Sequence, residues 1–446
     1  MGVFAKRGKS AEEDDVRRAS QELNQQQEKK EHDSKSCYSH LEAQFLMKNH
    51  GVVLKLYIEN FKRMNDLFGL EYCDELLEEI LKYLEQKSGC VVYRYVGVEF
   101  IIIMKNRTIA DASWLVEQLT ERFNESWTIK GTDCLCSVQI ALCAYPGYAS
   151  NVGEILKYLD MAVSHGAERG SNQAIVYDKE LHQQFVRRQI IAKYLNTAIS
   201  KGETEVSYRP IYDREKKGFS RAEFQMRIFV PELGMIDSSE YLSIAEDTGQ
   251  IRQVEYYALD RAAAAVAGLL KRKRNFESIA LPISSMLLLQ GDFLQEVSQV
   301  METYQLPPKK LAIEIDEYAA VASYARLTVL LQGLSWMGVE LILNNFGSGS
   351  TGLSRIFDLP VDTLKFNRTF VGELENSAKF APVIGGLVQI AKKMKKKVIA
   401  EGVETQRQRE FLDKFGCSMQ MGSYYSPVIP EKELLSVLRT FSDSSR

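Results

Sequence analysis

The second half of this sequence has no histidine, because all five histidines of the 446-residue chain lie before residue 183. A metal ion bound after that point would depend on oxygen ligands, which suit Mg²⁺, Mn²⁺ or Ca²⁺ better than zinc. The chain also lacks an apolar run of membrane length, and its first residues lack the hydrophobic core of a signal peptide. These absences predict a cytoplasmic protein without a membrane-spanning segment.

Cysteine pairs and excess charge are also absent. The seven cysteines form no CxxC pair, and an odd number of cysteines is typical of reduced, buried thiols in a cytosolic protein. The net charge of −3 argues against a dedicated nucleic-acid binder. The basic runs at 271–274 and 392–397 fall at predicted helix ends, where lysine complements the helix dipole. We therefore expect neither a nucleic-acid partner nor a membrane partner.

Hydrophobic periodicity divides the chain into three parts. Residues 1–38 are highly charged and nearly free of large apolar side chains, so we expect a flexible tail. Residues 39–180 give strand–helix–strand twice, with one strand expected over residues 134–145, which is the pattern of a ferredoxin-like or palm domain. Residues 181–446 alternate strands and helices about eight times, which predicts a (β/α)₈ barrel of the TIM-barrel type. Both domains are thus expected to be α/β.

Seven predicted strands of the barrel end in residues that bear on function. The strands are residues 220–227, 278–284, 310–317, 339–347, 362–367, 397–404 and 418–425. In such barrels the active site lies at the carboxyl ends of the strands. Five ends carry Glu223, Glu314, Asn344 with Asn345, Lys365 and Glu401. The other two carry Pro282 and Met421, which cannot ligate a divalent ion, so the pattern indicates an active site that has lost its metals.

The barrel half resembles EAL-domain cyclic-di-GMP phosphodiesterases. The resemblance rests on YRPI (208–211), AEFQMR (222–227), IAEDTGQI (244–251), EIDE (314–317), NNFGSGSTGLSRIFDLPVDTLKFNRTFV (344–371) and VIAEGVETQ (398–406). The preceding half resembles GGDEF diguanylate cyclase domains through ENFKRMNDLFG (59–69), RYVGVEF (94–100) and LDMAVSHGAERGSN (159–172). The resemblance implies a tandem GGDEF–EAL protein of cyclic-di-GMP signalling.

In the EAL family, two divalent ions activate a water that attacks a phosphodiester of the cyclic dinucleotide. The resemblance implies that Glu223 and Glu314 match metal ligands and that Lys365 matches the lysine that steadies the water. It also implies that Glu401 matches the proposed general base and Glu404 a supporting glutamate of the same loop.

The departures from the family pattern fall on the metal ligands. Pro282 replaces an asparagine, and Asn344 and Asn345 replace paired aspartates, so two negative charges are lost from a site for two divalent ions. Further changes replace an aspartate by Asn367, a glutamine by Met421 and a tyrosine by Ser423. We therefore expect no metal and no cofactor, with Lys365, Glu401, Glu404, Glu223 and Glu314 as vestiges. Mg²⁺ or Mn²⁺ would bind only if residual phosphodiesterase activity exists.

Without the ions, Glu223, Glu314 and Glu401 would repel one another, and at least one would tend to hold its proton. Arg209 stands where the family has a glutamine, and we expect it to replace part of the missing cationic charge together with Lys365. The alternative is that Arg209 points to solvent. Arg227 matches the family arginine that contacts a ligand phosphate, a contact that needs no metal. The candidates for ligand binding are Arg209, Glu223, Arg227, Glu314, Asn344, Asn345, Lys365, Asn367 and Glu401.

The first domain also departs from its family. Its signature becomes Val96, Gly97 and Val98 before the retained Glu99, and Tyr57 replaces a metal-binding aspartate. Valine and tyrosine offer no ligand suited to Mg²⁺, so we expect no metal site here either.

These observations favour a catalytically inactive GGDEF–EAL protein that regulates by docking to an unidentified protein partner. The alternative is a metal-independent receptor that binds cyclic-di-GMP in the barrel, and the third possibility is residual phosphodiesterase activity. The family also implies a homodimer that pairs through residues 347–357.

Overall fold

The computed structural model of the chain describes residues 32–273, 275–318, 324–347, 356, 358–376 and 380–438. The chain forms two compact units, residues 1–186 and 187–446. Their boundary falls inside helix α7 (Lys179–Lys201), a few residues beyond the predicted limit at 181. Residues 1–31 of the predicted tail lie outside the described residues, as do residues 348–355 of the predicted dimer contact.

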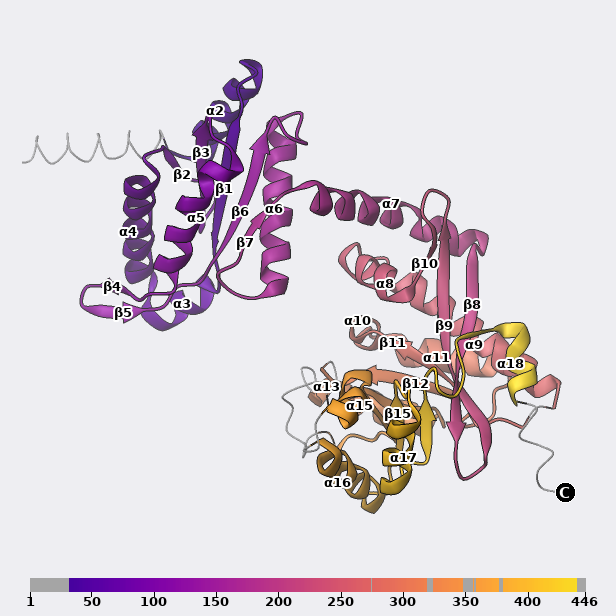
Figure 1. Cartoon of the computed structure of the whole chain (residues 1–446). Coiled ribbons are helices and arrows are strands. Elements are labelled where there is room, and N and C mark those ends of the chain that lie inside the picture. The colour runs from indigo at the N-terminus through magenta and orange to yellow at the C-terminus, as the bar shows by residue number, and fades with distance from the viewer. Residues whose placement is uncertain are drawn as a thin grey trace, which may run out of the picture. The chain divides into compact units, whose positions relative to one another are not determined.

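The first unit is built on a five-stranded sheet with the order β2-β3-β1-β6-β7 (Figure 1). The strands are β1 (Gly51–Ile58), β2 (Val92–Arg94), β3 (Glu99–Lys105), β6 (Val138–Tyr145) and β7 (Ala174–Val176), with a separate hairpin of β4 (Trp127–Ile129) and β5 (Thr132–Cys134). The helices are α2 (Ser34–Leu46), α3 (Phe61–Phe68), α4 (Leu70–Ser88), α5 (Ile109–Phe123) and α6 (Val152–Arg169). This arrangement is the palm topology that the sequence predicts.

Two details of the first unit differ from the sequence analysis. Residues 34–38, which were expected in the tail, belong to helix α2, where Asp33 accepts a hydrogen bond from the Ser36 amide and Cys37 is fully buried. The run from Cys134 to Tyr145 reads as one strand in sequence, but β5 ends at Cys134 and β6 begins at Val138. Alternating burial alone does not reveal that break.

Eight strands of the second unit close into a barrel, with β8 and β9 as a long hairpin (Figure 1). They are β8 (Thr204–Asp213), β9 (Gly218–Val230), β11 (Ser278–Ile283), β12 (Leu311–Asp316), β13 (Glu340–Phe346), β14 (Thr363–Phe366), β15 (Lys397–Glu401) and β16 (Met419–Met421). Short strands β10 (Gly234–Ile236) and β17 (Ile429–Pro430) extend β9 and β8. All seven strands that the sequence analysis assigned to functional ends are confirmed.

Helices surround this barrel, as the alternating pattern predicts. They are α8 (Ser238–Asp247), α9 (Ile251–Lys271), α10 (Ser285–Leu288), α11 (Phe293–Thr303), α13 (Tyr324–Trp336), α15 (Arg368–Asn376), α16 (Phe380–Lys393), α17 (Gln406–Phe415) and α18 (Glu431–Val437). Among the described residues, no helix combines the length and the apolar character that a membrane crossing requires.

The first strand of the barrel, β8, departs from the strict alternation of strands and helices that the sequence predicts. β8 runs antiparallel to both β9 and β16, and a turn at residues 214–217 joins β8 to β9 where a parallel pair would need a crossover helix. The other neighbours from β9 to β16 pair in parallel.

Two layers of apolar side chains stabilise the barrel, and polar side chains fill its interior at one end. A large core lies between the strands and the helices. A small separate cluster contains Ile211, Ala280, Ala312, Ile342, Ile399, Met419 and Met421. Since side chains alternate along a strand, Ala312 and Glu314 share one face of β12. The cluster therefore continues directly into a layer of charged side chains.

Glu255 on α9 predicts a pH-dependent stability of the second unit. It is 3% exposed and accepts hydrogen bonds from the Ser284 amide (2.8 Å) and hydroxyl (2.6 Å). Burial raises the pKa of Glu255 to about 7, so the folded chain holds this proton more tightly than the unfolded chain. The resulting stabilisation is fully present below pH 4.5 and is lost as the pH rises to 7, a change of about 3 kcal/mol.

We expect Glu255→Gln to remove this decrease from the plot of unfolding free energy against pH. The variant should therefore gain stability relative to the parent chain between pH 5 and pH 8. Urea unfolding at half-unit steps of pH measures the difference. Parallel profiles for the two proteins would show that Glu255 titrates normally.

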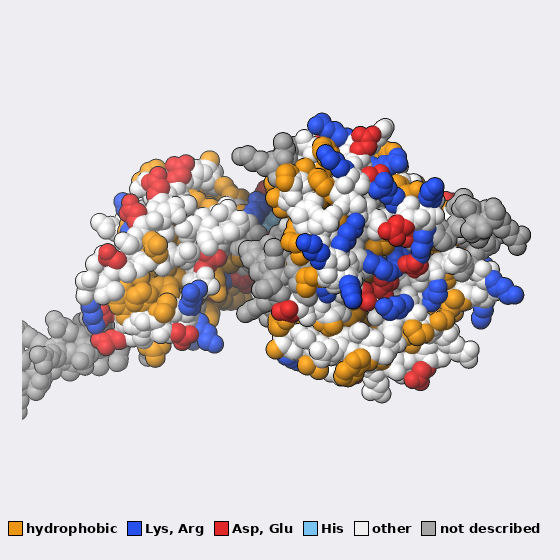
Figure 2. All heavy atoms as spheres, turned by 90° about the horizontal axis from the view of Figure 1, so that it is seen from below, with side chains coloured by type: hydrophobic (Ala, Val, Ile, Leu, Met, Phe, Trp, Pro, Cys, Tyr) orange, Lys and Arg blue, Asp and Glu red, His pale blue; other side chains and the backbone are white. Residues whose placement is uncertain are grey.

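Lys and Arg side chains gather on the face of the second unit that Figure 2 shows, with fewer Asp and Glu side chains between them. The turn between β8 and β9 lies at the lower end of that unit in Figure 1, the side from which Figure 2 is seen. The carboxyl ends of the parallel strands lie at the opposite end of the barrel.

Candidate functional site

Four predicted residues meet inside the barrel. Glu223 on β9, Glu314 on β12 and Lys365 on β14 are 5%, 1% and 1% exposed, and Glu401 ends β15. The pairing of the strands brings Glu223 and Glu314 to the same level of the barrel. On one side of β11, Ala280 pairs with Glu223 of β9, and on the other side Pro282 pairs with Glu314 of β12. The strands thus bring together residues that are far apart in sequence.

The Lys365 ammonium group lies at the centre of this cluster. Its Nζ donates to Glu223 Oε2 and, at 2.9 Å, to Glu314 Oε2, and it lies 3.4 Å from Glu401 Oε2. Burial opposes the charged form, but the three carboxylates outweigh it and hold the pKa of Lys365 above its ordinary value. One buried cation is therefore shared by three acids.

The two buried acids respond to that cation in opposite directions. Burial acts against ionised Glu223, yet Lys365 and then Arg209 hold its pKa below the usual value. Burial raises the pKa of Glu314 to about 7, although Lys365 acts against the rise. Glu314 Oε1 is also buried without a hydrogen-bond partner. This result agrees with the expectation that one carboxyl group tends to hold its proton.

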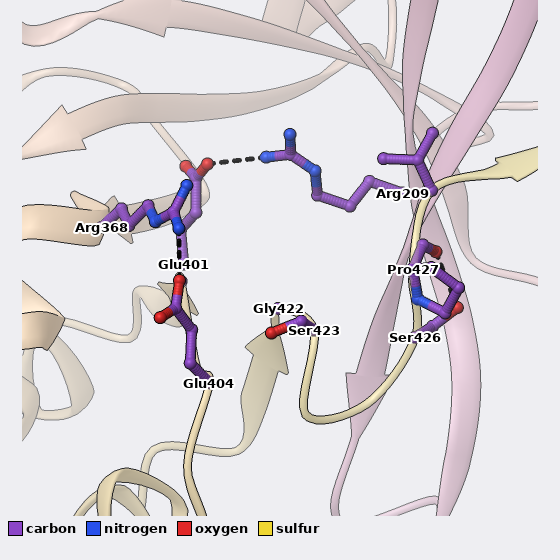
Figure 3. A pocket seen from close by; sticks show the side chains of 10 residues that line it. Arg209, Arg368, Glu401, Glu404, Gly422, Ser423, Ser426 and Pro427 are labelled. Carbon is purple, nitrogen blue, oxygen red and sulfur yellow. Dashed lines mark hydrogen bonds and ion pairs between the residues drawn. The ribbon is translucent and has the colours of Figure 1, made fainter.

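Arg209 takes part in the cluster and does not point to solvent. Its Nη1 donates to Glu401 Oε1 at 2.8 Å, and the two side chains are 30% and 17% exposed (Figure 3). In the same view Arg368 at the start of α15 pairs with Glu404. These residues line a cavity of about 180 Å³ together with Ser423. Arg209 and Lys365 thus place two cations against the family's acidic positions.

We expect Arg209→Gln to lower the stability of the second unit by about 1 kcal/mol near neutral pH, because a half-buried ion pair is partly screened. Urea unfolding measures the change. The same substitution at Arg214, which is largely exposed beside Asp413, is the control and should cost less. Equal stabilities of the Arg209 variant and the parent chain would contradict a role for Arg209 in neutralising Glu401.

The asparagines at positions where the resemblance implies aspartates form hydrogen bonds with one another and with Asp316. Asn345 Nδ2 donates to Asp316 Oδ2 at 2.7 Å, and Asn367 Nδ2 donates to Asn345 Oδ1 at 3.0 Å. Asn345 has φ of 56°, a left-handed conformation that asparagine tolerates better than most residues. Asn344 Oδ1 accepts from the Asn345 amide at 2.8 Å. A chain of amide hydrogen bonds therefore stands where the family has two aspartates.

The residues present do not fit two divalent ions. Pro282 has no side-chain donor atom beside Glu314, and Met421 is fully buried in the apolar cluster. Within the described part of the chain, no group of three or more His, Cys, Asp and Glu side chains could hold a metal ion. An ammonium group already occupies the space between Glu223 and Glu314. Glu223 and Glu314 are therefore paired with a cation of the protein itself.

Arg227 lies beside the cluster on a separate cavity of about 650 Å³. The cavity lining includes Ser207, Arg209, Gln225, Arg227 and Asp237. Arg227 Nη2 pairs with Glu205 at 3.0 Å, and the Arg227 side chain is 39% exposed. A guanidinium at the wall of a cavity of this size is accessible to an anionic ligand, since exchange of the Glu205 contact for a phosphate contact costs little.

The first unit contains a second buried lysine, which the sequence analysis missed. Lys55 on β1 is 3% exposed, and its Nζ contacts Glu99 at 2.9 Å as well as Asp160 on α6. Glu59 instead accepts a hydrogen bond from Gln139 at 2.9 Å. Glu99 and Glu59 therefore each have a partner within the protein. A lysine inside the apolar run GVVLKLYI was the available signal.

Two domain families match the chain. The family model described as EAL domain matches residues 192–428, and the one described as diguanylate cyclase, GGDEF domain, matches residues 34–173. The matched ranges agree with the two compact units of the fold.

Curated relatives are similar to most of this chain. MucR of Pseudomonas aeruginosa, a bifunctional diguanylate cyclase/cyclic di-GMP phosphodiesterase, is 27% identical over 86% of this chain and 56% of its own length. The cyclic di-GMP phosphodiesterase PdeR of Escherichia coli is 24% identical over 85% of this chain and 57% of its own length. The chain thus spans about half of the length of the curated relatives it matches.

Solved structures give the same fold. The phosphodiesterase of P. aeruginosa MucR in complex with c-di-GMP has a TM-score of 0.52 and 27% identity, and covers 55% of this chain and 99% of that one. The EAL enzyme Bd1971 has a TM-score of 0.54 at 17% identity over 76% of this chain and 81% of its own, which supports the fold alone. The chain therefore belongs to the EAL-domain family, and a GGDEF domain precedes its EAL domain.

Proposed function

We propose that this chain is a non-catalytic GGDEF–EAL protein that acts in cyclic-di-GMP signalling by docking to another protein. The observation that supports it is the set of residues at the strand ends, where Pro282 beside Glu314 has no side-chain donor and Asn344 and Asn345 bring no negative charge. Two-metal hydrolysis needs a pair of ions that clamp the attacking and leaving oxygens. The retained Glu223 and Glu314 supply too few oxygen donors and too little negative charge to hold such a pair without the residues that Pro282, Asn344 and Asn345 replace.

The retained scaffold also supports a docking role. The barrel is closed and its helices are packed, although Pro282, Asn344 and Asn345 stand where the resemblance implies metal ligands. The curated relatives are named as enzymes, and their names give the signalling system to which we assign this chain. Fold and function are separable, because function depends on the residues of a site.

A second candidate is a receptor that binds cyclic-di-GMP without cleaving it. The cavity beside Arg227 favours it, as does the c-di-GMP complex of the 27% identical MucR phosphodiesterase. Arg227 would contact a phosphate of the ligand, and Arg209 would add positive charge nearby. The third candidate is residual phosphodiesterase activity, for which Mg²⁺ or Mn²⁺ would have to displace Lys365 from its acids.

Two assays on the purified full chain separate these candidates. We expect no hydrolysis of cyclic-di-GMP with Mg²⁺ or Mn²⁺, and no saturable heat when the ligand is titrated calorimetrically in Mg²⁺ or EDTA. Saturable heat that survives EDTA and disappears in Arg227→Ala would establish the receptor. Metal-dependent hydrolysis that disappears in Glu223→Gln would overturn the non-catalytic proposal.

A further inference from the structure

The end of the barrel opposite the carboxylate cluster is strongly basic. The loops that lead into the strands, together with the turn between β8 and β9, carry Arg214, Lys216, Lys217, Arg272, Lys273, Lys309, Lys310, Lys395, Lys396 and Lys397. We call these residues the basic platform. Figure 2 shows the corresponding abundance of Lys and Arg side chains on the side from which this end is seen. The chain as a whole has a net charge of −3, so the platform concentrates positive charge on one face.

Contacts between the loops make the basic platform one continuous surface. Lys310 Nζ donates to the carbonyl of Phe276 in the preceding loop, and the Lys309 amide donates to Gly338 O at 2.6 Å. Lys396 Nζ donates to two carbonyls of the loop before β14, those of Leu359 and Val361, at 2.9 Å each. The cations are therefore held on ordered backbone.

Acidic groups are set among these cations. Glu277 contacts Lys216 and Arg221, and lies 3.7 Å from Lys397 Nζ. Glu340 is 1% exposed and pairs with Arg221. The platform is thus a mosaic in which acids lie between and beneath the cations.

The internal acids neutralise the basic platform only in part, since Lys309 pairs with Asp362 at 3.3 Å and Arg214 pairs with Asp413 at 3.5 Å, whereas the platform has ten cations. Burial, followed by repulsion from Arg221, lowers the pKa of both Lys310 and Lys397. Three exposed lysines, Lys217, Lys273 and Lys395, lie at positive φ, where they terminate turns and carry their charge at the outer edge. The excess positive charge is consequently available to a partner.

From this arrangement we propose that the basic platform docks an acidic segment of a protein partner. The inference rests on the proposed docking function and names the chemistry of the partner. Separate carboxylates on a protein can meet the lysines while avoiding Glu277 and its neighbours. Nucleic acid or an anionic bilayer presents dense, regular negative charge, which the interspersed acids would repel.

The composition of the surface supports the same choice. Lysine outnumbers arginine among the platform residues, whereas arginine supplies the bidentate contacts that favour phosphate.

Fluorescence anisotropy with a labelled sixteen-residue peptide rich in glutamate tests the proposal on the full chain, with an uncharged glutamine peptide as reference. We expect saturable binding of the acidic peptide that weakens between 50 and 200 mM salt, as a screened surface interaction should. The variant Lys217→Glu/Lys273→Glu/Lys395→Glu should bind at least about tenfold more weakly. The matched variant Lys62→Glu/Lys201→Glu/Lys432→Glu changes the net charge equally at exposed positions elsewhere and should stay within about twofold.

Competing partners are tested in parallel arms with a duplex oligonucleotide and with phosphatidylserine vesicles. Tighter binding of either than of the acidic peptide would overturn the proposal, as would equal peptide affinities of the two triple variants or the absence of saturable binding. Hydrolysis of cyclic-di-GMP is measured on the same preparations. Hydrolysis would refute the non-catalytic function, whereas loss of peptide binding alone would refute only the acidic partner.

Discussion

Replacement of Lys365 by methionine is expected to destabilise the second unit by about 3 to 5 kcal/mol, the cost of leaving buried charge unpaired. Lys365 is 1% exposed and holds the charge of Glu223 and Glu314, which are themselves buried. Methionine fills a similar volume, so the loss reports electrostatics more than packing. Part of this loss of stability should disappear at low pH, because Glu223 and Glu314 can take up protons there and become uncharged.

Urea unfolding at pH 7, followed by circular dichroism, measures this loss. Trp127 is 4% exposed in the first unit, while Trp336 of the second unit is 86% exposed, so tryptophan fluorescence mainly reports the first unit as an internal reference. The fluorescence transition should stay in place while the dichroism transition of the second unit shifts to lower urea. Two probes are needed because a chain with two units need not unfold in one step.

The triple variant Lys365→Met/Glu223→Gln/Glu314→Gln should recover most of that loss, since an uncharged cluster needs no cation. Lys397→Met is the matched control, because Lys397 is half exposed and its pairs at 3.7 and 3.9 Å are loose. It should cost less than about 1 kcal/mol. If Lys365→Met and Lys397→Met proved equally stable, the shared ammonium would not be what balances the buried acids.

Much of this site follows from chain order and strand direction. Parallel strands bring their carboxyl ends to one end of a barrel, so Glu223, Glu314, Lys365 and Glu401 could be expected to meet. Replacements that remove a side-chain donor, such as Pro282, are also legible in sequence. These features follow from the type of each residue and from the face of the strand on which its side chain lies. Both can be read from the sequence without knowledge of how the helices and strands pack together.

Which side chain each of these residues contacts could not be predicted in the same way. That Arg209 turns toward Glu401 depends on β8 running antiparallel beside β16, and alternating strands and helices suggested a parallel strand there. The pairing of Asn345 with Asp316 depends on a left-handed backbone at Asn345. Lys55 in the first unit resembles an outward-facing strand residue until α6 brings Asp160 to it. Each case is decided by geometry between elements distant in sequence.

The combined variant Pro282→Asn/Asn344→Asp/Asn345→Asp is expected to bind Mn²⁺ where the parent chain does not. It restores an oxygen donor beside Glu314 and two negative charges at the end of β13. Additional carboxylates raise the affinity of oxygen-lined sites for divalent ions, and they also offer Lys365 new partners. The gain should appear as saturable heat in a calorimetric titration with Mn²⁺, abolished by EDTA.

The gain in Mn²⁺ affinity should depend on the positions of the added charges. The variant Gln295→Glu/Gln299→Glu adds the same charge on the exposed face of α11 and should show no saturable heat. Asn344→Asp/Asn345→Asp with Pro282 retained should bind more weakly than the full set, because one donor is still missing. If the restored chain fails to bind Mn²⁺ while it unfolds at the same urea concentration as the parent, lost ligands cannot explain the absence of metal.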